Sequence, residues 1–359
     1  MSQIHQRRHD IDWLRVIAIG LLLVYHTSIV FQPWGTMVGF MTNIPSWETL
    51  WVPMAMLNVW RIPLLFFVSG MGVYFSIQNR DFKQLLTERT IRILIPFVFG
   101  VLVIAPIYIF LLQYYYKREQ EYVPNPAHLW FLGNIFVYVI ILSPLFFYLK
   151  NNERAIQFVK KAFVHPLGLL SVFIFFIIEV LMVKPAIYEL YVMTWHGFFL
   201  GLIAFLFGFC FAMCGTSFWD TLVKWKWVWI ILATALYIYR IFQPFMKVSD
   251  VQLVIESNLW IYTVLAFSYQ YLNKPSKKLI YLSEAVYPMY ITHMIFLGVG
   301  CLLILPLNMV VYLKFFFILF FTVAGSFISY EFLIKRLIVL RFLFGLSIKK
   351  EMRKEKVVQ

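Results

Sequence analysis

Long apolar runs constrain the fold of this chain more than any other feature. A helix needs about 20 predominantly apolar residues to cross a bilayer, and ten such stretches occur along the 359 residues. We therefore predict an all-α, polytopic integral membrane protein with about ten transmembrane helices. The expected spans are 11–32, 51–76, 91–113, 128–149, 165–183, 194–213, 225–243, 254–272, 283–305 and 310–334.

Composition supports this class. The chain is 62% hydrophobic and 13% charged, whereas a soluble domain is usually about 45–50% apolar and about 25% charged. No soluble domain is indicated beside the apolar region. We expect a single membrane-embedded domain, 1–359, with its spans over 11–334 and a basic cytoplasmic tail at 335–359.

The distribution of basic residues predicts the orientation of the helices. The net charge of +14 would suggest nucleic-acid binding in a soluble chain. Here 23 of the 31 Lys and Arg residues fall on one side of the predicted topology and five on the other. Under the positive-inside rule both termini lie in the cytoplasm. The charge thus reflects topology, and no nucleic-acid partner is expected.

Three ionisable side chains lie deep within predicted spans. His26 is about 16 Å beyond Arg15 at the helical rise per residue, roughly halfway through the hydrocarbon core. Arg61 and His293 reach about the same depth in two other spans. Such residues are costly in a membrane and usually mark a functional site. The alternative for Arg61 is a structural ion pair, or a guanidinium that snorkels outward to the membrane surface.

Other polar residues have simpler explanations. Asp12 and Arg15 share the face of His26 but lie at the cytoplasmic end, where they could serve as interfacial anchors. His128, Trp130 and His196 are expected near the outer face. Glu179 lies within the fifth predicted span, and Glu256 and Asn258 begin the eighth on the outer side. Each could be a pairing partner or line a cavity, and we expect a structural role for any one of them alone. The three cysteines lie in apolar segments and indicate neither a disulfide framework nor a metal site.

Several motifs together resemble the membrane-bound acyltransferase family 3. Arg15, ten further residues and His26 match the R/K-X10-H pattern of that family. The other landmarks are D-W-L-R at 12–15, R-I-P-L-L-F-F-V-S-G at 61–70, H-L-W-F-L at 128–132 and S-E-A-V-Y-P-M-Y-I-T-H at 283–293. The R-I-P-L-L-F-F form is similar to the subgroup that includes glucan biosynthesis protein C.

This resemblance implies a multi-pass enzyme of the bacterial inner membrane. It would move an acyl group, usually acetyl, from cytoplasmic acyl-CoA to a hydroxyl of a cell-envelope or exported glycan. Its partners would be acyl-CoA, a carbohydrate acceptor and the lipid bilayer, with no bound cofactor. Succinyl transfer, a covalent acyl-enzyme and any oligomeric state stay open.

The resemblance also assigns roles to residues. His26 would be the catalytic histidine and Arg15 its motif partner, while Arg61, His128 and His293 match further motif positions. The motifs also contain the orienting candidates Asp12, Ser69 and Trp130.

Acyl transfer from a thioester needs a base for the hydroxyl proton and a positive group for the oxyanion. A histidine suits the first task because its unperturbed pKa is near 6.5. We expect His26 to be the base, Arg61 to stabilise the oxyanion or hold anionic donor groups, and His293 to be a second base or an orienting residue. Arg15, Arg89 and Arg92 could attract the phosphates of CoA, although the positive-inside rule alone also explains such loop arginines.

Two other classes of function compete with this prediction. A transporter or flippase would use the buried ionisable residues as a proton or substrate pathway. A membrane sensor or scaffold would leave those residues unexplained. We identify no internal repeat, which argues weakly against a repeat-built transporter.

Overall fold

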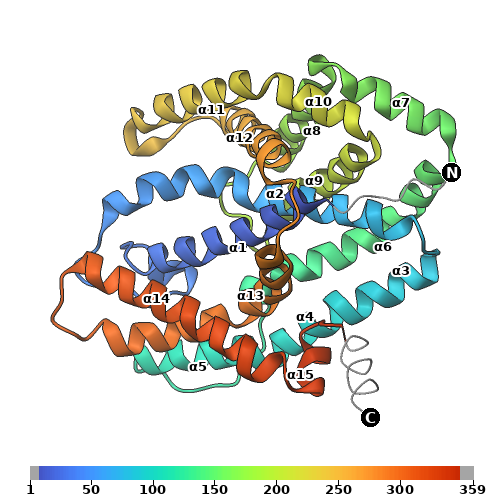
Figure 1. Cartoon of the computed structure of the whole chain (residues 1–359). Helices are drawn as coiled ribbons and strands as arrows, with labels where there is room; N and C mark the ends of the chain where they lie inside the picture. Colours follow the sequence, from blue (N-terminus) through green and yellow to red (C-terminus); the bar gives the residue numbers. More distant parts are fainter. Residues whose placement is uncertain (1–7, 348–359) are drawn as a thin grey trace, which may run out of the picture. The chain divides into compact units, whose positions relative to one another are not determined.

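The computed structural model describes residues 8–347, and these contain helices and no strands. Figure 1 shows the helices in chain order. Their bounds are α1 His9–Ile29, α2 Trp51–Ile77, α3 Phe82–Arg89, α4 Ile95–Phe99, α5 Ala105–Tyr115, α6 Trp130–Asn151, α7 Glu153–Val164, α8 Pro166–Val183, α9 Trp195–Met213, α10 Thr216–Lys224, α11 Lys226–Ile241, α12 Asp250–Leu272, α13 Lys277–Ile304, α14 Val311–Ser329 and α15 Ile338–Leu343.

The prediction of an all-α polytopic membrane protein is confirmed. Within the described chain, nine helices are long and apolar enough to cross a membrane. A tenth span is obtained if α10 and α11, which meet at a bend of 58°, are counted as one. The part of the predicted tail beyond residue 347 lies outside the described residues.

The third span is longer and less regular than its apolar run suggests. Helical structure is continuous from Phe82 to Tyr115. It includes π-helical turns at Thr90–Leu94 and Gly100–Ile104, between the α-helical parts α3, α4 and α5. Such turns displace backbone carbonyls from the regular hydrogen-bond ladder and are frequent near functional sites.

Several helix starts follow from local side-chain caps. Asn152 accepts a hydrogen bond from Ala155 N at the start of α7. Thr194 and Ser249 cap α9 and α12 in the same way. These caps satisfy backbone N–H groups that have no partner within the helix, so the polar breaks between apolar runs define where the helices begin.

Two compact units are distinguished, and each combines separate parts of the chain. Unit 1 takes the residues up to Ala18 together with 55–86 and 137–279. Within it, α12 packs along α11 and α8, and α8 packs along α9. Close helix packing is also supported by stacked aromatic rings, such as Phe146 and Phe209 with centroids 3.9 Å apart.

Unit 2 takes residues 19–54 and 87–136 and those from Ile280 onward. Its core is formed by α1, α5, α13 and α14 with the segment that follows α1. Buried members include Phe31, Phe40, Tyr108, Leu297 and Phe315. This core surrounds the position of His26 within α1.

Candidate active site

Three histidines from separate parts of the sequence meet in unit 2. His26 comes from α1, His293 from α13, and His128 from a short 3₁₀ turn, Ala127–Leu129, that precedes α6. Nδ1 of His26 lies 2.8 Å from Nε2 of His293. The His128 ring stands edge-on to the His293 ring, with centroids 4.9 Å apart. We call these residues the histidine cluster.

The backbone partners of the cluster fix which nitrogens carry protons. Nδ1 of His293 lies 2.6 Å from the carbonyl oxygen of Tyr290. Because a carbonyl only accepts, this nitrogen is the donor, and the neutral His293 ring has its lone pair on Nε2. That lone pair accepts the Nδ1–H of His26. The lone pair of a neutral His26 is therefore on Nε2, the nitrogen suited to act as a base.

His128 is fixed by the same kind of contact. Its Nε2 donates to the carbonyl oxygen of Ile291 at 3.1 Å. Its Nδ1 is buried and has no hydrogen-bond partner among the described residues. The hydroxyl of Tyr290 in turn donates to the His128 carbonyl. These bonds hold the turn that carries His128 against α13.

The environment of the cluster is apolar and aromatic. His293 is fully buried, whereas His26 is partly exposed. The ring of Phe40 meets His26 edge-on at 5.4 Å, and Tyr25 is 5.8 Å from His26 between centroids. A partly exposed base held by a buried orienting group is an arrangement suited to proton transfer.

Arg15, the first residue of the R/K-X10-H motif, lies in unit 1. Nη1 of Arg15 is 3.3 Å from Oδ1 of Asp12, one turn earlier in α1. A Cβ atom at Gly72 of α2 would lie 2.7 Å from Nη2 of Arg15. The absence of a side chain at Gly72 therefore makes room for the Arg15 guanidinium.

Arg61 and Ser69 also belong to unit 1, on α2. Arg61 is fully buried. The Ser69 hydroxyl donates to the Leu65 carbonyl of its own helix at 2.7 Å, an ordinary intrahelical bond. Trp130 is 7% exposed at the start of α6, in unit 2. The catalytic and orienting roles of these residues stay predictions.

Arg89 and Arg92, expected in a loop, lie instead within the continuous helical segment Phe82–Tyr115, and they differ in exposure. The side chain of Arg92 is 54% exposed and pairs with Glu88 at 3.3 Å, while Arg89 is only partly exposed. The carbonyl of Arg92, in the first π-helical turn, accepts from the Tyr287 hydroxyl of α13 at 2.9 Å. Arg92 is therefore the more accessible of the two for an anionic donor.

Buried acids outside the cluster are paired, as the sequence suggests. Nδ1 of His196 lies 2.9 Å from Oε1 of Glu179. Nη2 of Arg240 lies 2.7 Å from Oε1 of Glu256. All four side chains are buried. Both pairs are in unit 1, and each ties two neighbouring helices together.

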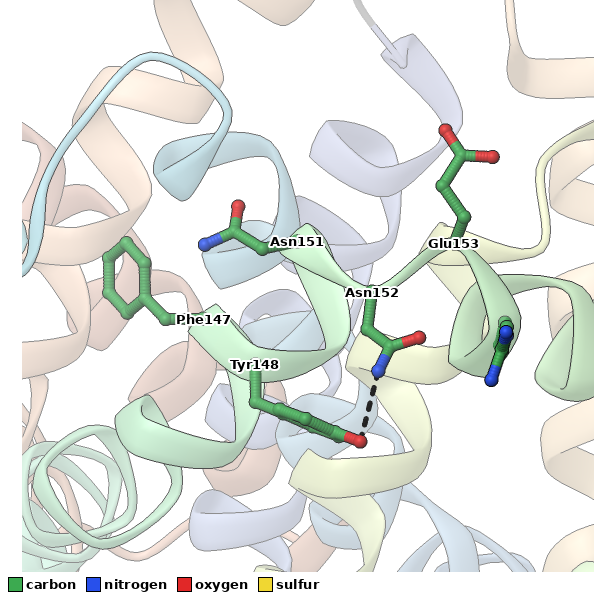
Figure 2. A pocket seen from close by; sticks show the side chains of 6 residues that line it. Phe147, Tyr148, Asn151, Asn152 and Glu153 are labelled. Atoms are coloured by element: carbon green, nitrogen blue, oxygen red, sulfur yellow. Dashed lines mark hydrogen bonds between the residues drawn. The ribbon is translucent and has the colours of Figure 1, made fainter.

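A surface pocket of about 610 Å³ lies in unit 1 where α6 meets α7 (Figure 2). It is lined by Phe147, Tyr148, Asn151, Asn152, Glu153 and Arg154. Asn152 caps α7 and donates to the Tyr148 hydroxyl at 3.0 Å. The polar groups of Asn152 are thus committed to local structure, and none of the predicted site residues lines the pocket.

Within residues 8–347, no group of three or more His, Cys, Asp or Glu residues could hold a metal ion.

Sequence reasoning missed three contributors to these sites. The Tyr290 carbonyl that orients His293 is a backbone group, and no side-chain pattern reveals it. Phe40 lies in a connecting segment without helical periodicity. Gly72 was detectable only as a small residue shortly after the R-I-P-L-L-F-F-V-S-G stretch.

The chain matches a known protein family. A family model described as an acyltransferase domain (Acyl_transf_3) matches residues 8–331, nearly the whole chain. The match includes every member of the histidine cluster. Neither a curated protein nor a solved structure matches the chain.

Proposed function

Because the chain belongs to acyltransferase family 3 and is a membrane acyltransferase, we propose that it is an acyl-CoA-dependent O-acyltransferase. It transfers an acyl group, with acetyl as the first candidate, from cytoplasmic acyl-CoA to a hydroxyl of a cell-envelope or exported glycan. The glucan-like form of the motif at 61–70 supports a glucan acceptor and makes succinyl the second candidate acyl group.

The hydrogen bond from His26 to His293 carries this proposal. In direct transfer, Nε2 of His26 takes the proton from the acceptor hydroxyl while its oxygen attacks the thioester carbonyl. The resulting imidazolium keeps its Nδ1–H on His293, which holds the ring in place. Collapse of the tetrahedral intermediate breaks the C–S bond, and the proton passes from His26 to the thiolate of CoA. An ester and free CoA result, and His26 is regenerated.

Arginines supply the positive charge that this reaction needs. Arg61 is proposed to stabilise the oxyanion or to hold anionic groups of the donor, because a buried guanidinium stays charged in proteins. Arg15, Arg89 and Arg92 are proposed to attract the phosphates of CoA. Arg15 and Arg61 belong to unit 1, whereas Arg89 and Arg92 belong to unit 2.

The deciding experiment uses purified protein in nanodiscs with radiolabelled acetyl-CoA and candidate glycans, with succinyl-CoA in parallel. We expect label in the glycan, and its loss in His26→Ala. The matched control is His165→Asn, which alters a histidine that caps α8 in unit 1 and preserves a capping side chain. Absence of thioester turnover with either donor, together with flux of an unmodified glycan in vesicles, would refute the proposal in favour of a transporter.

We further propose that the protein resides in the bacterial inner membrane with both termini in the cytoplasm. The 23-to-5 distribution of basic residues supports this orientation. Accessibility tags at positions 120 and 276 are expected on opposite sides of the membrane, with 276 cytoplasmic. Finding both tags on one side contradicts the topology without affecting the assignment of the chemistry.

A further inference from the structure

A row of aromatic rings leads away from His26 within unit 2. Tyr25 is the residue before His26 in α1, and its ring centroid is 5.5 Å from that of Trp51 at the start of α2. The Trp51 ring meets Trp34 edge-on at 4.6 Å. We call Tyr25, Trp34 and Trp51 the aromatic row. All three side chains are partly exposed, so the row joins the partly exposed His26 to solvent-accessible surface.

The segment between α1 and α2, residues 30–50, carries Trp34 and is held in place by side chains from other elements. Three tyrosine hydroxyls of α5 and its C-terminal cap donate to its carbonyls: Tyr108 to Gly39 at 2.8 Å, Tyr115 to Thr42 at 2.9 Å and Tyr116 to Phe40 at 3.0 Å. Lys314 of α14 donates to Oδ1 of Asn43 at 3.2 Å. A binding surface built on such a fixed segment loses little conformational freedom when a ligand binds.

The charge of the segment restricts what can bind there. Between residues 30 and 50, Glu48 is the only charged residue. Lys314 is 7% exposed and is also bonded to the Leu305 carbonyl at 2.6 Å. The segment 30–50 therefore combines aromatic faces with almost no charge, and it carries no lysine or arginine of its own that would recognise a phosphate or a carboxylate.

We propose that the aromatic row binds an uncharged pyranose unit of the acceptor and presents its hydroxyl to Nε2 of His26. The C–H bonds on one face of a pyranose are weakly positive and pack against the negative face of an aromatic ring. Tyrosine and tryptophan also suit a surface with one apolar and one hydrated side. This inference rests on the proposed function and on the segment 30–50 being on the outer side of the membrane.

The test separates acceptor binding from the chemical step. In the nanodisc assay, Trp51→Ala and Trp34→Ala are each expected to raise the KM for an uncharged oligosaccharide by about two- to tenfold, a loss typical of one aromatic contact. The KM for acyl-CoA and the acceptor-independent hydrolysis of acyl-CoA should stay at the wild-type level.

Two control variants accompany these alanine variants. Trp51→Phe should retain most of the affinity for the oligosaccharide. Trp195→Ala removes a tryptophan of unit 1 that is 72% exposed, and it should leave the acceptor KM unchanged.

Binding is measured independently by tryptophan fluorescence. Maltohexaose, laminarihexaose and cellohexaose serve as uncharged probes, and a galacturonate oligomer serves as the anionic probe. At least one uncharged probe should shift the emission of the wild type but not of the double variant Trp34→Phe/Trp51→Phe, which lacks both tryptophans of the row. The anionic probe should have no effect. An unchanged acceptor KM in both alanine variants, with intact thioester turnover in the wild type, overturns the row as a sugar site while leaving the proposed function standing.

Two other results also count against the row. Binding of none of the uncharged probes overturns it. Brominated lipid quenches the fluorescence of tryptophans that it contacts. If it quenches the tryptophans of the row and saturating oligosaccharide does not relieve this quenching, lipid covers these rings, and the inference is overturned as well. Loss of thioester turnover in the wild type would instead be a failure of the proposed function.

Discussion

Nδ1 of His26 donates to Nε2 of His293, and the two nitrogens are 2.8 Å apart. The Tyr290 carbonyl fixes the direction of this bond because it accepts the remaining proton of His293. A neutral imidazole thus takes the place that a carboxylate occupies in many catalytic histidine pairs. The proposed base, His26, is oriented without placing a negative charge in an apolar environment.

Substitutions of His293 should therefore lower kcat, and the fall should be larger when the new side chain offers no hydrogen-bond acceptor to His26. Leucine at this position removes the acceptor and leaves Nδ1–H of His26 without this bond, and we expect kcat to fall about 100-fold or more. Glutamine can place its side-chain oxygen near the former Nε2, so it should retain more activity than leucine. Equal activity of His293→Leu and wild type, measured by release of CoA, contradicts an orienting role.

The buried pair of Arg240 and Glu256 should be important for stability rather than for chemistry. Arg240 also contacts the Ala55 carbonyl at 3.2 Å, and both side chains are at most 1% exposed. Glu256→Leu leaves the buried guanidinium with only its longer contact to Glu189, at 3.5 Å, and removal of one partner of a buried ion pair typically costs about 3–5 kcal/mol. We expect a large fall in the thermal unfolding midpoint. The double variant Arg240→Met/Glu256→Leu should recover part of the lost unfolding temperature, because both charges are then removed. A double variant that is less stable than either single variant contradicts this account.

Glycines at the crossing of α2 and α9 should not tolerate even a methyl group. A Cβ at Gly70 would lie 1.9 Å from the Phe205 carbonyl oxygen, and a Cβ at Gly208 would lie 2.0 Å from that of Phe67. Either alanine substitution forces the helices apart and should destabilise the protein by about 1–3 kcal/mol or more. A Cβ at Gly20 of α1, in contrast, would meet no heavy atom within 4 Å. Gly20→Ala should therefore be neutral or slightly stabilising in the same unfolding measurement.

The thiol of Cys214 should be unreactive in the folded protein. Burial raises the pKa of this thiol to about 12, the neighbouring Cys210 adds to the effect, and Lys160 opposes it. Since the thiolate is the nucleophile, only roughly one thiol in 10,000 is ionised at pH 8. Alkylation by N-ethylmaleimide at pH 8, followed by mass spectrometry, should leave Cys214 unlabelled until the protein is unfolded. A cysteine introduced at the exposed Glu119 should react rapidly, and labelling of Cys214 at a similar rate contradicts the burial argument.

Hydropathy alone predicted most of the fold because membrane-spanning helices satisfy their own backbone hydrogen bonds. Each span is therefore a local property of about 20 residues, and α8, predicted at 165–183, is observed at Pro166–Val183. The bend of 58° between α10 and α11 was not predicted. The π-helical turns between Thr90 and Ile104 were also missed, since they depend on contacts made by other parts of the chain.

The sequence by itself predicted that His26, Arg61 and His293 lie deep within their spans, because depth follows from counting residues along a helix. It did not determine that His128, expected near the outer face, would meet His293. Only the tertiary structure decided that meeting, together with the proton positions of the histidine cluster, because both depend on backbone carbonyls of α13. Side-chain spacing specifies a face of a helix, but the partner of that face is chosen by packing between segments more than 100 residues apart.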